Sequence, residues 1–499
     1  MAQHVDVLIV GAGISGIGSA CHLTRESPNK SYLILERRHA IGGTWDLFRY
    51  PGIRSDSDMY SFAYHFRPWH ETRLLADGHK IRHYVEDTAT EYGVQEHIRF
   101  GRKVSSASWS SEDGLWTVEA TDEATGKTET YTATYLMGCT GYYNYDEGYR
   151  PEFPGEKKFT AAGGTIIHPQ FWPEDLDYAG KRVVIIGSGA TAITLVPAMA
   201  ETAAHVTMLQ RTPTYVISLP SIDPIAVNMQ RAKMPANVIY KVGRARNIAM
   251  QRGFYQLTRS RPELARKIVL GWIRSQTRGK IDMKHFTPDY NPWDQRMCVA
   301  PSGDLFKVLR DGNASVVTDQ IDTFTATGIK LKSGEELPAD IIVTATGLKI
   351  QIMGGIHVEV DGNVLTTADS VLYKGVMVDG VPNAMIILGY TNASWTLKAD
   401  LAAEWFCRLI NHMDDKGYTQ VVAHAKPGDR AEESVMGSAL TSGYIKRAEG
   451  VMPRQGTHRP WKVLNDYVRD APALRRGRIE DGILTFTRAK TRKPVSAGR

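Results

Sequence analysis

Two glycine-rich turns, 176 residues apart, constrain the fold more than any other feature of this 499-residue chain. In "VDVLIVGAGISGIGSACHL" an apolar strand is followed by Gly11-x-Gly13-x-x-Gly16 and a helix-forming segment. The segment "KRVVIIGSGATAITLVPAMAE" repeats the pattern from Gly187 to Ala192. In such turns the first glycine allows a tight bend, the second lets the backbone approach a diphosphate, and the third position lets helix pack on strand. We therefore predict an α/β protein with two Rossmann-like dinucleotide-binding domains.

The residue that ends the next strand of each unit predicts which dinucleotide it binds. "SYLILERR" ends in Glu36, 25 residues after Gly11, and a carboxylate there can accept hydrogen bonds from ribose hydroxyls. "HVTMLQRTPTY" contains Arg211, 24 residues after Gly187, and a guanidinium can pair with a 2′-phosphate. The economical interpretation is a chain that binds FAD in the first unit and NADPH in the second.

Two further strands that end in glycine predict where the chain crosses between these domains. They are "YLMGCTGYYN" at 135–144 and "ELPADIIVTATGLKI", which ends its strand at 345–347. We predict a discontinuous FAD domain (1–144 and 348–499), an NADPH domain (145–218 and 291–347) and a helical insertion (219–290). For each strand taken alone, an ordinary buried strand with a turn glycine is an equal alternative. The basic tail "RAKTRKPVSAGR" is predicted to be disordered.

The composition excludes several classes of protein. The hydrophobic share of 42% is that of a soluble domain, and no apolar run approaches the roughly 18 residues of a membrane span. The N-terminus lacks the features of a secretory signal. The four cysteines form no CxxC or CxxxxC pair, so we expect no metal site, no redox disulfide and a cytoplasmic location. Their spacing also argues against a disulfide reductase, which shares the two-dinucleotide layout.

The positive charge is concentrated in one segment. Residues 231–280 contain thirteen Lys or Arg against a single acid, Glu263, whereas the rest of the chain has 47 bases and 53 acids. The segment is interpreted as a solvated helical face, a patch that steers NADPH phosphates, or a surface for anionic lipid, and peripheral membrane contact stays a hypothesis. No nucleic-acid motif or interleaved aromatic residue accompanies it, so we expect no nucleic-acid partner.

One loop resembles a family motif at every specified position. "GGTWDLFRYPGIRSD" (42–56) is similar to [A/G]GxWxxxx[F/Y]P[G/M]xxxD, the motif of type I Baeyer–Villiger monooxygenases. The segments "GYYNYDEGY", "YNPWDQRMC" and "GYTNASWTLKADL" resemble the ethionamide-activating subgroup of that family. The resemblance extends from about residue 5 to about residue 485.

The second fingerprint of the family, FxGxxxHxxxWP, resembles "TAAGGTIIHPQFWPE", with Gly164, His168 and Trp172 in register. Ala162 stands where the family has phenylalanine, and the nearest one is Phe159. Trp172 favours the Baeyer–Villiger branch over the related heteroatom-oxidising enzymes. The resemblance implies that these residues form a hinge element rather than acid–base machinery.

The resemblance also implies a reaction. In this family NADPH reduces FAD, O₂ forms a C4a-peroxyflavin, and oxygen is inserted beside a ketone carbonyl to give an ester. S- or N-oxygenation of sulfides or thioamides by the same intermediate is the alternative. Substrate and O₂ are thus the expected partners, and the substrate is a small ketone or sulfide.

The family's catalytic arginine matches Arg296, and its aspartate partner matches Asp56. Taken without the resemblance, Arg296 would be interpreted as a surface residue after a Trp-Asp turn, and the family match reverses that interpretation. A guanidinium about 4 Å from a developing negative charge contributes on the order of 4 kcal/mol at an effective dielectric near 20. That is roughly a thousandfold in rate if the interaction acts only in the transition state.

The remaining site residues follow from the motifs and the resemblance. For FAD we expect contacts from Gly11, Gly13, Ser15, Gly16, Glu36, Thr44, Trp45, Asp46, Leu47, Asp56 and Val104. For NADP we expect them from Arg54, Ser55, Gly187, Ser188, Gly189, Ala190, Thr191, Ala192, Ile193, Arg211 and Thr212. Some relatives carry a lysine where this chain has Gln295, so Arg211 is expected to bear more of the phosphate recognition.

Overall fold

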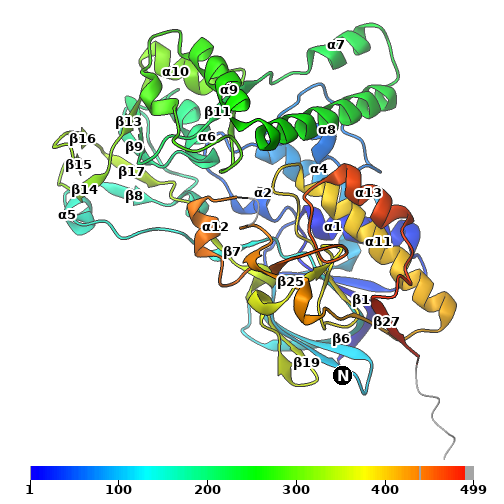
Figure 1. Ribbon diagram of the computed structural model, residues 1–499. Helices are drawn as coiled ribbons and strands as arrows, with labels where there is room; N and C mark the ends of the chain where they lie inside the picture. Colours follow the sequence, from blue (N-terminus) through cyan, green and yellow to red (C-terminus); the bar gives the residue numbers. More distant parts are fainter. Residues whose placement is uncertain (1, 438–439, 489–499) are drawn as a thin grey trace, which may run out of the picture.

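A computed structural model describes residues 2–437 and 440–488 of the chain. The tail from residue 489, for which the sequence predicts disorder, lies outside the described residues. Two separate sheets, one mixed and one entirely parallel, dominate the molecule, with the helices of the 219–290 segment above them (Figure 1).

The first sheet is built around the N-terminal strand, whose six residues "VDVLIV" are almost all buried. Its parallel core has the order β23 (Ala384–Ile386), β6 (Thr128–Gly138), β1 (Gln3–Val10), β2 (Tyr32–Glu36) and β3 (Ile98–Phe100). β5 (Leu115–Asp122) pairs with the first half of β6 on the same edge as β23, and β4 (Arg102–Ser110), β19 (His357–Val360) and β20 (Asn363–Val364) follow it. Helices α1 (Ile14–Glu26) and α11 (Trp395–Lys416) pack on each other beside this sheet.

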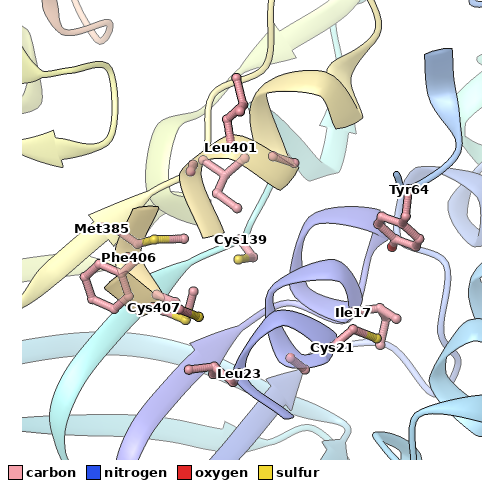
Figure 2. Packing of buried hydrophobic residues seen from close by; sticks show 14 of the residues in the cluster. Ile17, Cys21, Leu23, Tyr64, Cys139, Met385, Leu401, Phe406 and Cys407 are labelled. Carbon is pink, nitrogen blue, oxygen red and sulfur yellow. The ribbon is translucent and has the colours of Figure 1, made fainter. Parts of the chain in front are cut away.

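Figure 2 shows part of the core around α1 and α11, in which Cys139 and Cys407 lie on the side of α1 that faces α11, whereas Cys21 lies beside Ile17 on the side toward Tyr64. All four cysteines are free and buried. Burial raises the pKa of Cys21 to about 12 and that of Cys139 to about 12, so both stay protonated thiols at neutral pH. These cysteines are therefore packing residues.

The second sheet is entirely parallel, with the order β13 (Ala314–Thr318), β10 (His205–Gln210), β9 (Arg182–Ile186), β17 (Ile341–Thr344) and β8 (Thr165–Ile167). Helices α6 (Ala190–Met199) and α10 (Asp304–Asp311) pack on each other beside it. A small antiparallel sheet of β14 (Ile321–Phe324), β15 (Gly328–Leu331) and β16 (Glu336–Pro338) adjoins helix α5 (Glu156–Ala161). The predicted fold class, α/β with two such units, is confirmed.

The chain passes from the first sheet to the second through β7 (Tyr143–Gly148) and returns through β18 (Leu348–Ile350). These two strands pair with each other in antiparallel fashion. Both predicted crossings therefore lie side by side. The division into an FAD and an NADPH domain at these points stays a prediction.

The 219–290 segment leaves the second sheet after β11 (Val216–Leu219) and returns at β12 (Cys298–Pro301), which pairs with β11. It contains α7 (Pro224–Arg231), α8 (Ala236–Ser260), α9 (Pro262–Thr277) and the short η3 (Met283–Phe286). Helix α8 packs against the first unit, where Arg244 donates hydrogen bonds to the carbonyl oxygens of Tyr60 (2.8 Å) and Ala63 (2.9 Å). Helix α9 instead packs in the core of the second unit through Val269 and Ile273. The helical segment thus contacts both units.

The other elements are short or lie in the C-terminal part. They are α2 (Thr44–Leu47), α3 (Met59–Phe62), α4 (Gly78–Glu91), β21 (Leu372–Tyr373), β22 (Met377–Val378), β24 (Gln420–Ala423), β25 (Arg430–Ser434), α12 (Gly443–Arg447), β26 (Arg454–Gly456), α13 (Tyr467–Arg476) and β27 (Leu484–Thr487). Short 3₁₀ turns occur at η1 (Gln95–His97), η2 (Pro169–Phe171), η4 (Ile352–Gly355), η5 (Thr367–Asp369) and η6 (Pro427–Asp429).

A buried polar network joins α1 to α11. His22, which is fully buried, lies 2.7 Å from Glu26 through Nδ1 and 3.4 Å from Asp400 through Nε2. His65 lies 3.1 Å from the other oxygen of Asp400. Burial opposes ionisation of both partners, yet their mutual contacts raise the pKa of His22 to about 9 and hold the pKa of Asp400 well below its usual range. We interpret the cluster as an ion-pair network, because every one of these groups already has a partner.

Candidate active site

The first glycine turn is packed so tightly that only glycine fits at two of its positions. A Cβ on Gly11, whose φ is +102°, would lie 2.7 Å from the carbonyl oxygen of Cys139. A Cβ on Gly16 would lie 1.8 Å from the carbonyl oxygen of Gly11. Gly13, at the N-terminus of α1, faces only Gly43, at 3.5 Å. The turn therefore presents open backbone at a helix N-terminus, which fits a diphosphate.

Glu36 lies at the edge of the same turn, as the sequence predicts. Its carboxylate accepts hydrogen bonds from the backbone N–H groups of Ala12 (2.7 Å) and Arg38 (2.8 Å). Burial raises the pKa of Glu36, against the lowering effect of these two bonds. Glu36 and Val104 line one cavity together with Gly11 and Gly13. This group fits the ribose of a dinucleotide whose diphosphate lies on α1.

The loop after Gly43 contains the short helix α2. Thr44 is hydrogen-bonded to Tyr143 (2.5 Å), and Ser15 on α1 accepts a hydrogen bond from the indole of Trp395 (2.8 Å). Trp45 packs edge-on against Phe62. These contacts place the loop beside the N-terminus of α1.

Asp46 has a different role from the one expected for a direct cofactor contact. Its buried carboxylate is engaged by Arg38 (2.7 Å), Arg49 (2.5 Å) and Arg82 (3.3 Å). Its backbone is engaged as well, since the carbonyl oxygen accepts from Arg49 (2.9 Å) and the N–H donates to Gly43 (3.1 Å). Asp46 therefore anchors the loop, and its predicted contact with FAD stays a prediction.

Arg54 and Ser55 lie where the first unit meets α10 of the second. Arg54 forms an ion pair with Asp304 (2.7 Å), and its buried Nη2 has no hydrogen-bond partner among the described residues. The hydroxyl of Ser55 bonds locally with the backbone of Ser57. The unpaired nitrogen of Arg54 is a buried donor that fits a ligand acceptor.

The second glycine turn has the same design as the first. A Cβ on Gly187, whose φ is +138°, would lie 2.3 Å from the carbonyl oxygen of Ala345, whereas nothing lies within 4 Å of a Cβ on Gly189. Gly189 precedes α6, and Ser188 bonds to the backbone of Thr212 (3.1 Å). The N-terminus of α6 is thus open. Ala192 and Ile193 are buried, while Ala190 is exposed and Thr191 is half-buried beside the turn.

Arg211 is exposed, and its guanidinium has no hydrogen bond or ion pair to any described residue. A second guanidinium, that of Arg447 on α12, faces it from the C-terminal part of the chain. Arg447 stacks on the ring of Tyr149 at 3.4 Å, and its Nη2 lies 3.9 Å from where a Cβ on Gly347 would be. Burial and repulsion by Arg211 lower the pKa of Arg447, although Tyr149 opposes them. Sequence reasoning missed Arg447, because it belongs to no motif.

Arg296 lies in the loop between α9 and β12, in a recess formed by both units. Protein atoms surround Arg296 on several sides, but its side chain is still accessible to solvent. Its guanidinium has no hydrogen bond or ion pair within the part of the chain that the structure describes. Burial opposes its ionisation, but Tyr142, Tyr444 and Asp56 raise the pKa of Arg296 overall. The structure thus brings the two predicted catalytic residues into one recess without a direct ion pair.

Asp56 is half-buried beside Arg296. Burial raises the pKa of Asp56 to about 6, against the lowering effect of Arg54 and Arg296. Its charge therefore changes just below neutral pH. Cys298 shares the recess, but burial raises the pKa of its thiol, so it is not a nucleophile at neutral pH.

The loop that holds Arg296 is fixed at two points. Arg259 on α8 forms an ion pair with Asp294 (2.8 Å), and the backbone N–H of Thr441 donates to the carbonyl oxygen of Asp294 (2.7 Å). The helical insertion and the C-terminal segment therefore position this loop. Neither contact is visible in the sequence, since 35 and 147 residues separate the partners.

The second fingerprint lies against the crossing strands. A Cβ on Gly148, at the end of β7, would lie 2.0 Å from the ring of His168, and Gln170 donates to the carbonyl oxygen of Asn144 (2.9 Å). The ring of Phe159, which is fully buried, fills the space beside Gly164, where a Cβ would lie 2.4 Å from it. Phe159 therefore packs directly against the glycine of the fingerprint. Trp172 packs at the margin of the second unit's core.

A cleft of about 630 Å³ lies between the second half of α8 and the loops at 392–397 and 464–469. Its walls combine apolar side chains such as Ile248 and Leu397 with polar ones such as Gln251 and Arg252. The cleft has the size of a small-molecule site.

Two sheets with parallel strands at their centres, each with an open glycine turn at a helix N-terminus, define the chain as an α/β protein with two dinucleotide-binding units. Residues 4–245 match the family model described as flavin-binding monooxygenase-like. The chain is 56% identical over 487 residues to the probable FAD-binding monooxygenase AlmA of Acinetobacter baylyi, covering 97% of each chain. It is 51% identical over 497 residues to the FAD-containing monooxygenase EthA of Mycobacterium tuberculosis, covering 99% of this chain and 100% of EthA. The protein belongs to the flavin-binding monooxygenase family.

Two solved structures share the fold. Steroid monooxygenase bound to NADP superposes with a TM-score of 0.75 at 22% identity, covering 97% of this chain and all of that one. Cyclohexanone-bound cyclohexanone monooxygenase superposes with a TM-score of 0.69 at 22% identity, covering 86% of this chain and 90% of that one. The prediction of an FAD-containing monooxygenase is confirmed. No helix among the described residues is long and apolar enough to cross a membrane.

Proposed function

We propose that this monooxygenase converts ketones to esters with NADPH and O₂, a Baeyer–Villiger oxidation. The observation that carries the proposal is Arg296, a guanidinium left without a partner among the described residues, beside Asp56 in a recess between two open dinucleotide turns. A fixed cation at such a place stabilises negative charge that develops on oxygen during transfer to a carbonyl. The cytoplasmic location expected from the cysteines is part of the same proposal.

FAD, when bound and reduced by NADPH, supplies the oxygen chemistry, and the chain supplies binding, orientation and electrostatics. Arg296 stays protonated at any working pH and so keeps its charge throughout the reaction. Asp56 would orient this guanidinium when ionised. The N-terminus of α1 with Glu36 would hold FAD, and the N-terminus of α6 with Arg54 and Arg211 would hold NADPH. A retained nucleotide would also exclude water from the recess.

The proposal is tested with purified holoenzyme, NADPH, ¹⁸O₂ and a medium-chain 2-ketone, followed by mass spectrometry. Labelled ester supports it. NADPH consumption without ester would contradict it for that ketone, and the sulfide and thioamide arms of the same assay then test the alternative, S- or N-oxygenation. S- or N-oxygenation needs no stabilisation of negative charge at a carbonyl, so the rate of that reaction should depend little on Arg296.

The pH dependence should identify Asp56. We expect the rate of ester formation to fall as the pH drops through about 6, because protonation removes the carboxylate that orients Arg296. In Asp56→Asn this acidic limb should disappear and the rate above pH 7 should fall. The measurement is kcat/KM between pH 5 and 8, with Asp87→Asn, an exposed surface carboxylate, as the control. An acidic limb that persists in Asp56→Asn would assign it to another group.

The two facing guanidiniums should decide cofactor preference. We propose that Arg211 and Arg447 together bind the 2′-phosphate of NADPH. They would supply the positive charge that some relatives provide with a lysine at the position of Gln295. Loss of one charge-assisted contact costs about 1.5–3 kcal/mol, so Arg447→Ala should raise KM for NADPH roughly tenfold to a hundredfold. The KM for NADH, which lacks the phosphate, should not change. Lys446→Ala, its exposed neighbour, is the control, and an equal effect on both nucleotides would refute the assignment.

A further inference from the structure

The structure divides the basic side chains of residues 231–280 into those that bond within the protein and those that do not. Five of the thirteen basic side chains bond within the protein, namely Arg244, Arg246, Arg252, Arg259 and Arg266. The other eight are exposed and have no side-chain bond to a described residue: Arg231, Lys233, Lys241, Arg261, Lys267, Arg274, Arg278 and Lys280. Their charge is therefore not used to hold the fold together.

Exposed apolar side chains gather in the same segment. Of the large hydrophobic residues that are exposed among the described residues, eight lie between 222 and 272. Five of them lie from just before α7 to the first two turns of α8: Ile222 (53% exposed), Ile225 (48%), Met234 (39%), Val238 (38%) and Val242 (43%). Single exposed apolar residues are ordinary, but such a group on the hairpin of α7 and α8 marks an interaction surface.

The hairpin lies at the periphery of the molecule, where α7 and the turn into α8 form its outer edge (Figure 1). Its inner face is fixed: Asp223 caps α7 and pairs with Arg246, and Tyr240 bonds to the carbonyl oxygen of Tyr64 (3.0 Å). All nine residues from 230 to 238 are exposed. The outer face is therefore presented on a rigid support rather than on a loose loop.

The charge of this face has one sign. No Asp or Glu occurs from residue 224 to residue 262, and Asp223 is buried and already paired. We define the hairpin patch as Ile222, Ile225, Arg231, Lys233, Met234, Val238, Lys241 and Val242. Apolar side chains interleaved with unpaired bases, and without acids, are the pattern of helices that lie in the headgroup region of an anionic bilayer.

We propose that the hairpin patch docks the enzyme on an anionic lipid surface. Ile225, Met234 and Val238 enter the acyl boundary, and Arg231, Lys233 and Lys241 contact the headgroups. The second half of α8 lines the 630 Å³ cleft, and about 20 Å of helix separate Val242 from Tyr255 in the cleft wall. Docking thus brings the cleft close to molecules dissolved in the bilayer. The inference does not depend on which substrate is oxidised.

The test is co-sedimentation of the FAD-loaded enzyme with phosphatidylcholine vesicles that contain 0% or about 30% phosphatidylglycerol, at low and high salt. We expect binding only to the anionic vesicles, weakened by salt. Replacing Arg231, Lys233 and Lys241 together by glutamine should weaken the partition coefficient roughly a hundredfold, since each base near such a surface contributes about a factor of five. The matched control changes Lys127, Lys157 and Lys158, which are exposed elsewhere, to glutamine.

A second pair of variants tests the apolar part without changing the charge. Met234→Ser with Val238→Ser should weaken vesicle binding, whereas Val364→Ser with Val451→Ser, which are exposed at other places, should not. Equal binding to neutral and anionic vesicles, or equal effects of patch and control variants, would overturn the proposal. It would also be overturned if the patch variants changed the oligomeric state and left vesicle binding intact, since the partner would then be a second copy of the chain. Flavin absorbance and thermal stability confirm that each variant is folded.

Discussion

Replacing Arg296 with alanine is expected to abolish ester formation while NADPH is still oxidised. The guanidinium contributes on the order of 4 kcal/mol to the stabilisation of charge on oxygen, so the rate should fall about a thousandfold or more. NADPH consumption should continue with hydrogen peroxide as the product, because the residues proposed to bind both nucleotides are intact. The measurement is ester and peroxide yield per NADPH consumed.

Two variants make this result interpretable. Arg296→Lys keeps the charge but loses the planar donor geometry, and it should retain part of the activity. Arg274→Ala removes an exposed, unpaired guanidinium of α9 and should have no effect. Normal ester formation by Arg296→Ala would exclude the proposed role. Loss of NADPH oxidation together with ester would mean that Arg296 acts in nucleotide binding instead.

The second large effect is expected on stability. His22→Ala should destabilise the protein by about 3 kcal/mol, because it removes one of the two histidines that pair with the buried carboxylate of Asp400. The pKa of His22 is raised to about 9, so its contribution is fully present below pH 6.5 and is lost as the pH rises through 9. Asp400, whose pKa is depressed, contributes above its ordinary value near 4 and loses this contribution only in acid.

Thermal unfolding between pH 5.5 and 9.5 checks both statements. The gap in Tm between the native protein and His22→Ala should be widest at pH 5.5–6.5 and should narrow toward pH 9.5. His412→Ala removes a partly exposed histidine that pairs with Glu480 (2.8 Å), and such a pair is worth at most about 1 kcal/mol. Equal losses in the two variants, or a gap that does not change with pH, would contradict the buried ion-pair interpretation.

Local spacing is what made the two dinucleotide units predictable from the sequence. Gly11, Gly16 and Glu36 act through a turn, a helix and the next strand, all within 26 residues, so their sequence separation fixes their geometry. The same holds for Gly187 and Arg211. The roles of Arg296 and Asp56 came from the family resemblance alone, because 240 residues separate them and no periodicity connects them.

Residues that reach the site from distant segments were not predictable. Asp304 pairs with Arg54 across 250 residues, and Arg447 faces Arg211 across 236. Asp46 shows the reverse case, since its position in the motif suggests a cofactor contact while its carboxylate is taken by three arginines. Likewise, the sequence predicted that residues 219–290 are helical, but no feature of this segment indicated that α8 packs on the first unit. Such outcomes depend on tertiary packing, which a single sequence does not display.

The return of the chain through β18 has a consequence for synthesis on the ribosome. The second sheet and the insertion are complete once residue 344 has left the exit tunnel, whereas the first sheet still lacks β23 and its covering helix α11, which ends at Lys416. The N-terminal strands must therefore wait, partly unpaired, while more than 200 later residues are translated. Because domains usually fold in order from the N-terminus, this chain inverts the order: its second unit is the first that can be finished. The cavity beside the glycine turn at residue 11 is lined by Gln351, Gly354 and Ile356 as well, so it is complete only after the second sheet has been translated.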